Sequence, residues 1–175
     1  YGENKPAIGD HIFIKGLSHP GAFAPIIASP SWEKLGTAPL PAAKRVPIED
    51  LVLGVYDGQR VEVEGTVRSA HKDENRLHLV LAIGGHRLDV KAPVNAVEAP
   101  NSLIASTILV RGATATHYNQ NLRQLTGVGV YISQLSDFEI LAPEKTDPFS
   151  QAIIPMKRVA QYRKGMGSKQ RIHIR

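Results

Sequence analysis

The 175-residue sequence contains no cysteine and few aromatic residues. The absence of cysteine excludes thiol catalysis, cysteine-ligated zinc, iron–sulfur clusters and disulfides. Aromatic residues make up 6% of the chain, whereas 15 glycines and 12 prolines divide it into short apolar runs. No run approaches the roughly 18 apolar residues of a membrane-spanning helix, and we expect any anchor or export signal to lie outside this sequence. The composition favours a folded, β-rich domain over a helical bundle.

Positive charge is concentrated at one end of the chain. The formal net charge is +5, yet residues 148–175 hold seven basic residues and no acidic one. Subtracting these seven from the total of 21 leaves 14 basic against 16 acidic residues in 1–147, a net charge of −2. A surface that binds phosphates is expected to carry lysine and arginine across the main domain. We therefore do not expect nucleic acid to be a partner.

Alternation of apolar and polar residues predicts a series of short strands around a polar turn at 71–75 and a short helix or crossover at 94–103. The predicted strands are 59–70, 76–83, 86–92, 106–114, 128–133 and 138–141. Their order predicts an all-β fold with short helices, built as an OB-like five-stranded barrel. The predicted core is Val61, Val63, Val67, Leu79, Leu81, Leu88, Val90, Ile108 and Val110.

Three pairs of short segments have similar sequences and predict a tandem repeat. The pairs are 59–64 with 170–175, 12–16 with 108–112, and 32–35 with 138–141. In this interpretation residues 1–40 are the C-terminal strands of a first OB-like unit, 44–147 form a complete unit, and 148–175 are the entry helix and first strand of a third. The alternative is that such short β-segments recur by chance.

The two outer pieces cannot complete barrels of their own, so each would leave an unpaired strand edge. We expect these pieces to pack against the middle unit or to pair between copies, which would give a strand-exchanged homo-oligomer. The apolar segments 12–14 and 172–174 are the edges expected to pair.

Known catalytic and metal-binding patterns are missing from the sequence. The seven histidines have no ligand spacing, and the sequence has neither a Gly-rich phosphate loop nor a nucleophile elbow. We therefore predict no catalytic residue, no metal site and no cofactor. On the strands that bind oligonucleotides in many OB folds, the expected outward side chains include no aromatic residue, and Glu62, Glu64 and Asp89 would repel phosphate.

The polar connection between the last strands is the candidate binding site for a small ligand or a protein partner. Its alternative interpretation is a solvated hairpin loop. The candidate residues are His117, Tyr118, Asn119, Gln120, Asn121 and Arg123.

Residues 57–69, 77–81 and 84–88 resemble the tandem OB-like modules in the extracytoplasmic sensor regions of some bacterial sensor histidine kinases and related signalling proteins. Residues 121–128 resemble the hairpin between the fourth and fifth strands of those modules. The family's phosphoacceptor histidine box, ATP lid and transmembrane helices are absent from this sequence.

The resemblance implies a non-enzymatic sensor or interaction module of a two-component signalling protein. It would lie in the periplasm, attached to the membrane through flanking segments, with any kinase activity outside this chain. An unknown small ligand or protein would be its partner. Two alternatives are open: a nucleic-acid-binding OB-fold protein, which the basic segment 148–175 favours, and a periplasmic binding or scaffold protein.

Overall fold

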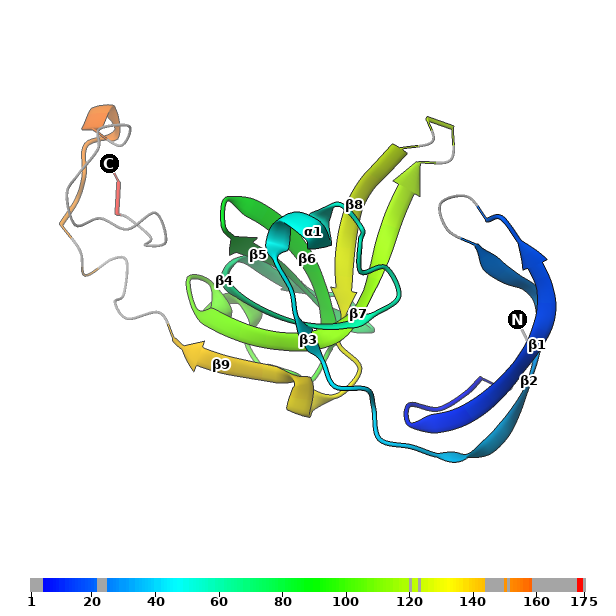
Figure 1. Ribbon diagram of the computed structural model, residues 1–175. Coiled ribbons are helices and arrows are strands. Elements are labelled where there is room, and N and C mark those ends of the chain that lie inside the picture. Colours follow the sequence, from blue (N-terminus) through cyan, green and yellow to red (C-terminus); the bar gives the residue numbers. More distant parts are fainter. Residues whose placement is uncertain are drawn as a thin grey trace.

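The computed structural model describes residues 5–21, 25–119, 121–122, 124–143, 150, 152–158 and 173–174. These residues form a two-stranded hairpin and a seven-stranded sheet that closes on itself (Figure 1). The elements are β1 (Asp10–His19), β2 (Ile26–Thr37), β3 (Lys44–Arg45), α1 (Ile48–Val52), β4 (Arg60–Lys72), β5 (Arg76–Ile83), β6 (His86–Pro93), η1 (Pro100–Leu103), β7 (Thr107–Asn119), β8 (Gln124–Tyr131), η2 (Leu135–Asp137), β9 (Phe138–Ala142) and η4 (Met156–Arg158).

β4 closes the barrel because its two halves pair with different strands. Residues 60–66 pair antiparallel with β7, and residues 66–72 pair antiparallel with β5. The ring continues through β6, which pairs antiparallel with β5, and β8, which runs parallel to β6 and antiparallel to β7. This is the five-stranded OB-like barrel expected from the sequence. β3 and β9 add to the ring at β4 and β7.

The sharp bend of β4 depends on Gly65. A Cβ atom at this position would lie 2.7 Å from Ile83 Cγ1, so only glycine lets the two strands approach this closely. A shift in the pairing with β5 follows between Val67 and Ser69. Because this irregularity shifts the alternation by one residue, Ala70 faces inward and His71 faces outward. Thr66, expected on the polar face, is buried at the bend.

The nine core residues predicted from alternation are all buried, which confirms the strand register. The core also contains Ile48 and Leu51 of α1, Leu77 of β5, Ala92 of β6, Leu103 of η1, Val128 and Val130 of β8, and Ile132. The crossover at 94–103 contains only the short η1. None of the helices in the described part of the chain is long and apolar enough to cross a membrane.

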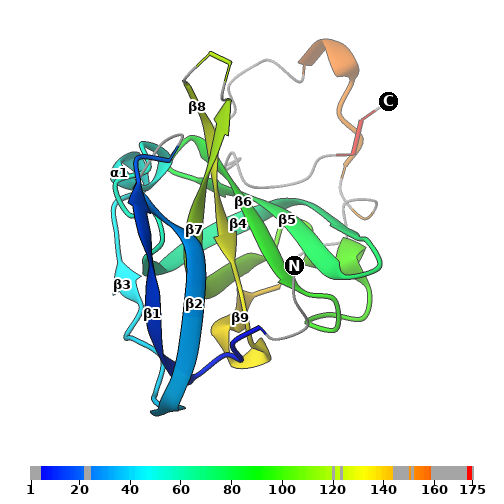
Figure 2. The ribbon, with the colours of Figure 1, turned by 90° about the vertical axis from the view of Figure 1, so that its right-hand side faces the viewer.

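The largest errors in the predicted strand boundaries are at the ends of 59–70 and 106–114 and at the start of 128–133. β4 continues through His71 to Lys72, so the predicted turn at 71–75 is shorter than expected. β7 and β8 extend beyond the barrel as a projecting hairpin (Figures 1 and 2), so His117, Tyr118 and Asn119 lie on a strand and not in a loop. Continued backbone pairing to Asn119 and Gln124 overrides the polar composition of this segment.

The division into three OB-like units stays a prediction. β1 and β2 pair antiparallel with each other, and Ile174 forms a parallel bridge with Ile154. Most of segment 170–175 lies outside the described residues.

Truncation of Leu79 tests the barrel core. Leu79 is 2% exposed, so Leu79→Ala should lower the free energy of unfolding by about 2–5 kcal/mol. The matched variant Leu122→Ala, at a side chain that is 64% exposed, should change it by less than about 0.5 kcal/mol. Denaturant unfolding measures both values. Equal effects of the two variants would contradict the assigned register.

Candidate functional site

A groove of about 380 Å³ lies over the outer face of β5 and β6. Residues from four strands line it, because β4 and β7 bring outward residues to its sides. The lining residues are His71, His78, Leu79, Val80, Asp89, Val90, Lys91 and His117. The groove therefore combines three imidazole rings with a lysine, an aspartate and Val80, whereas the side chains of Leu79 and Val90 belong to the core.

Two of the imidazole rings form a stacked pair. His71 of β4 is the direct register partner of His78 of β5. Their ring centroids are 4.9 Å apart and the rings are inclined by 11°. His78 Nε2 also lies 2.6 Å from Asp73 Oδ2, which ties the pair to the turn that joins the two strands. The result is a fixed, partly exposed aromatic surface along one side of the groove.

Two further rings flank Gly129 of β8. A Cβ atom there would lie 3.1 Å from His117 Nε2 and 3.3 Å from Tyr131 Cε2, so the missing side chain makes room for both rings. The parallel pairing of β6 with β8 sets Lys91 beside Tyr131, and Lys91 Nζ lies 5.2 Å from the Tyr131 ring centroid. This cation–π contact places Lys91 between the groove and Tyr131.

Asp73 organises the β4–β5 turn at the end of the groove. Its Oδ1 accepts hydrogen bonds from the backbone N–H groups of Asn75 and Arg76, at 2.8 and 2.7 Å. These two bonds, followed by the contact with His78, lower the pKa of the Asp73 carboxyl group from 3.8 to about 2. The turn is thus held by an ionised carboxylate.

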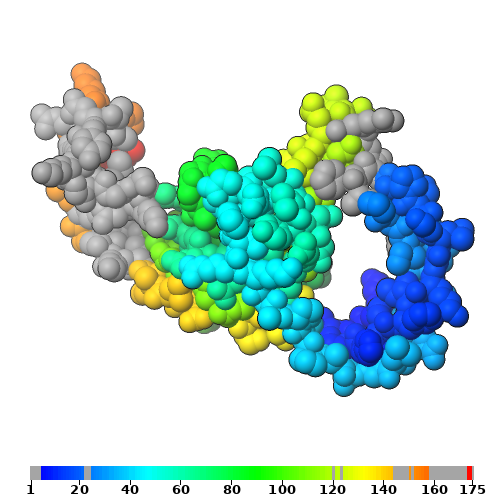
Figure 3. Space-filling view, in the orientation of Figure 1, coloured from blue at the N-terminus to red at the C-terminus, as the bar shows by residue number. Residues whose placement is uncertain are grey.

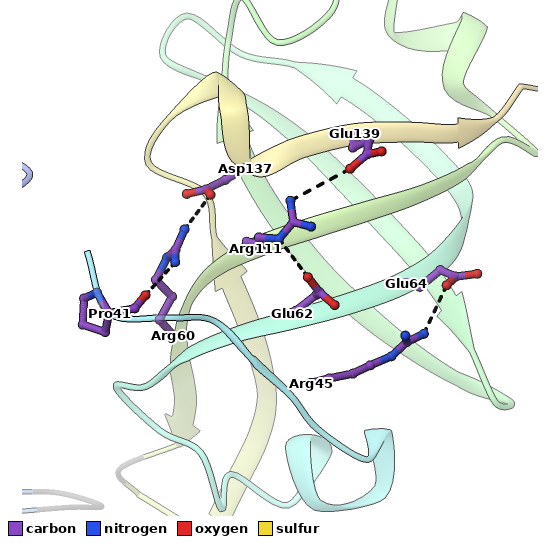
Figure 4. A network of polar contacts seen from close by, with 8 residues as sticks. All are labelled: Pro41, Arg45, Arg60, Glu62, Glu64, Arg111, Asp137 and Glu139. Carbon is purple, nitrogen blue, oxygen red and sulfur yellow. Dashed lines mark hydrogen bonds and ion pairs between the residues drawn. The ribbon is translucent and has the colours of Figure 1, made fainter. Parts of the chain in front are cut away.

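Two of the three carboxylates expected to repel phosphate do not line the groove. Glu62 Oε2 lies 2.8 Å from Arg111 Nε, and Glu64 Oε2 lies 3.3 Å from Arg45 Nη2 (Figure 4). Both belong to the half of β4 that pairs with β7. Asp89 is the one carboxylate among the lining residues. Three carboxylates were expected to repel phosphate on this face, and the structure places only Asp89 in the groove.

The six residues proposed from the sequence separate into two groups. His117 lines the groove, whereas Tyr118, Asn119 and Asn121 lie at the far end of the β7–β8 hairpin. The side chain of Asn119 accepts hydrogen bonds from the N–H groups of Asn121 and Leu122 at 3.0 and 3.1 Å, which shapes the turn. Gln120 and Arg123 lie outside the described residues. Ligand binding by this set stays a prediction.

Sequence reasoning missed the contributions of His71 and Tyr131 to this face. His71 was placed in a turn because the irregularity in β4 has no clear sequence signal. Tyr131 reaches Lys91 only through the parallel pairing of β6 with β8. Placing the last strand next to the third, as the OB topology requires, would have predicted that neighbour.

Searches against family models and against curated proteins found no match. Among solved structures, aspartyl-tRNA synthetase from Entamoeba histolytica has a TM-score of 0.45 and 15% identity, covering 58% of this chain and 22% of that one. Asparaginyl-tRNA synthetase from Pyrococcus horikoshii has a TM-score of 0.41 and 14% identity, covering 58% and 23%. A replication protein A heterotrimer bound to single-stranded DNA has a TM-score of 0.32 and 11% identity, covering 47% and 57%.

These likenesses concern the OB-like fold, and this chain spans about a quarter of the length of the two synthetases. The expectation that nucleic acid is not a partner is corrected: two of the three carboxylates on which it rested lie away from the groove, and the structures with a similar fold include two tRNA synthetases and a protein solved with bound DNA. The resemblance to histidine-kinase sensor modules is supported only for the fold. The signalling role has no support here, and the periplasmic location stays a prediction.

The low pKa of Asp73 predicts a pH-dependent contribution to stability. Since the folded pKa of about 2 lies below the unfolded value of 3.8, the contribution is complete above pH 3.8 and is lost as the pH falls towards 2. The wild type should therefore be more stable than Asp73→Ala near neutral pH, and the difference should close across this acidic window. Denaturant unfolding of both proteins at several pH values measures it. A difference that stays constant down to pH 2 would contradict the assigned bonds.

Proposed function

We propose that the barrel binds single-stranded nucleic acid in the groove over β5 and β6. The observation that carries this proposal is the gathering of His71, His78, His117 and Lys91 on one face of the barrel, with Tyr131 beside Lys91. OB folds use this face, between the loops after their first and fourth strands, to hold oligonucleotides. The chain would act as a binding module with no catalytic role of its own.

The rings supply the sequence-tolerant part of the proposed binding. Every base has a flat π face, and stacking on a protein ring contributes about 1–3 kcal/mol per base. The His71–His78 pair stands on β4 and β5, and the rings flanking Gly129 come from β7 and β8, on the other side of β6. A strand of nucleic acid crossing β5 and β6 would meet both sets of rings.

The charges of the groove imply modest affinity. Lys91 and Asp89 offset one another among the lining residues, and residues 1–147 carry a net charge of −2. Binding that depends on stacking more than on phosphate neutralisation has a shallow salt dependence, since each phosphate contact adds about −0.7 to the slope of log K against log salt for single strands. We therefore expect micromolar, sequence-tolerant binding.

Fluorescence anisotropy with a labelled single-stranded oligonucleotide tests this proposal. At about 50 mM salt the full chain should bind, and His71→Ala should weaken binding about fivefold or more, because one stacking surface is lost. Lys91→Ala should also weaken it. The matched variant Lys15→Ala removes the same charge from the hairpin and should leave the affinity unchanged.

Absence of binding at low salt would contradict the proposed function. An equal loss of affinity in Lys15→Ala and Lys91→Ala would also contradict it, because it would indicate net charge and not the groove as the cause.

A further inference from the structure

The β1–β2 hairpin repeats the backbone register of the barrel strands β7 and β9. Residues 12–14 of β1 correspond to residues 108–110 of β7, and residues 32–34 of β2 correspond to residues 138–140 of β9, so that three successive pairs match. In the hairpin these pairs are Ile12 with Lys34, Phe13 with Glu33 and Ile14 with Trp32. In the barrel they are Ile108 with Ile140, Leu109 with Glu139 and Val110 with Phe138. β1 thus has the place in the hairpin that β7 has in the barrel.

A close glycine contact provides a second, independent match. A Cβ atom at Gly112 of β7 would lie 2.6 Å from Tyr131 O and 2.8 Å from Val130 Cγ1. A Cβ atom at Gly16 of β1 would likewise lie close to a carbonyl oxygen, that of Ala28, and to a branched methyl carbon, Ile27 Cγ2. Ile27 and Ala28 therefore correspond to Val130 and Tyr131. β2 combines the pairing roles of β8 and β9 in one strand.

The matched residues differ in what covers them. Ile108, Val110 and Val130 are fully buried in the barrel, whereas Ile14 and Ile27 are 42% and 51% exposed. A hollow of about 420 Å³ lies against Ile14, Gly16 and Ile27. In Figure 3 the hairpin stands away from the barrel along part of its length, with open space between them. The hairpin therefore presents the equivalent of a barrel core face.

The free edge of β1 is also defined by this correspondence. β7 pairs with β8 and β9 on one edge and with β4 on the other. β1 pairs with β2 on the edge that corresponds to the β8 and β9 side of β7. Within the described part of the chain, no strand pairs with the other edge of β1, which corresponds to the β4 side of β7. Two-stranded ribbons are marginally stable alone, and an open edge can pair with an added strand.

We propose that β1 binds an extended segment of a partner polypeptide, which adds a strand antiparallel to it as β4 does on β7. On β7, Val63 lies opposite Val110, and Glu62 lies opposite Arg111 with a 2.8 Å ion pair. The corresponding residues of β1 are Ile14 and Lys15. The partner segment accordingly carries a branched apolar residue opposite Ile14 and a carboxylate opposite Lys15, so its side-chain charge complements the hairpin.

A peptide with the sequence of residues 59–66, Gln-Arg-Val-Glu-Val-Glu-Gly-Thr, is the probe for this surface. Trp32 is the single tryptophan of the chain and lies opposite Ile14, while the peptide contains none. Adding the peptide to the full chain should change the Trp32 fluorescence saturably and slow hydrogen exchange of β1 amides. A peptide with aspartate at both valine positions should do neither.

Charge exchange makes the test specific for the proposed register. Replacing the first glutamate of the peptide by lysine should weaken binding by up to about fivefold, and Lys15→Glu in the full chain should restore it. No saturable change of Trp32, protection at β7 instead of β1, or equal binding of the glutamate and lysine peptides would overturn the proposal. Self-association of the chain through this edge, detected by light scattering, would overturn it as well, because a second copy would then be the occupant.

Discussion

The barrel depends on one strand, β4, which pairs with β7 before its bend and with β5 after it. Gly65 lets the strand turn against Ile83, and the pairing irregularity after Val67 then reverses which residues face outward. His71 is brought beside His78 by this reversal, and the stacked pair forms one side of the groove. Closure of the barrel and formation of the candidate site thus have the same structural cause.

Several charged residues of the barrel gather near the start of β4, in the half that pairs with β7. Near its start, Arg60 is held between the Pro41 carbonyl oxygen and the buried Asp137, while Glu62 and Glu64 pair with arginines (Figure 4). Carboxylates neutralised in this way add little field at the groove on β5 and β6. Of the three carboxylates expected on this face, only Asp89 is left to oppose phosphate at the groove.

Much of the barrel could be predicted from the sequence, because alternation at residues such as Val61, Leu79 and Val90 reports directly which face is buried. Only part of the groove could be predicted, namely Asp89 on the outward face and His117 among the candidate binding residues. His71 faces outward only because of an irregularity in pairing, and Tyr131 meets Lys91 only because β8 runs beside β6. The contact of Lys91 with Tyr131 joins residues far apart in sequence, and the irregularity in β4 is defined by its pairing with β5, so local periodicity reports neither. The polar composition of His117 to Asn119 predicts a loop, yet these residues continue β7 because their backbone pairs with β8.

The most direct test of the binding account is to map the contact surface by nuclear magnetic resonance, titrating the isotope-labelled full chain with a single-stranded oligonucleotide. The account predicts that the largest shift changes fall on His71, His78, Lys91 and His117, with the β1–β2 hairpin unchanged. Shift changes concentrated on the hairpin, or none at saturating oligonucleotide, would contradict it.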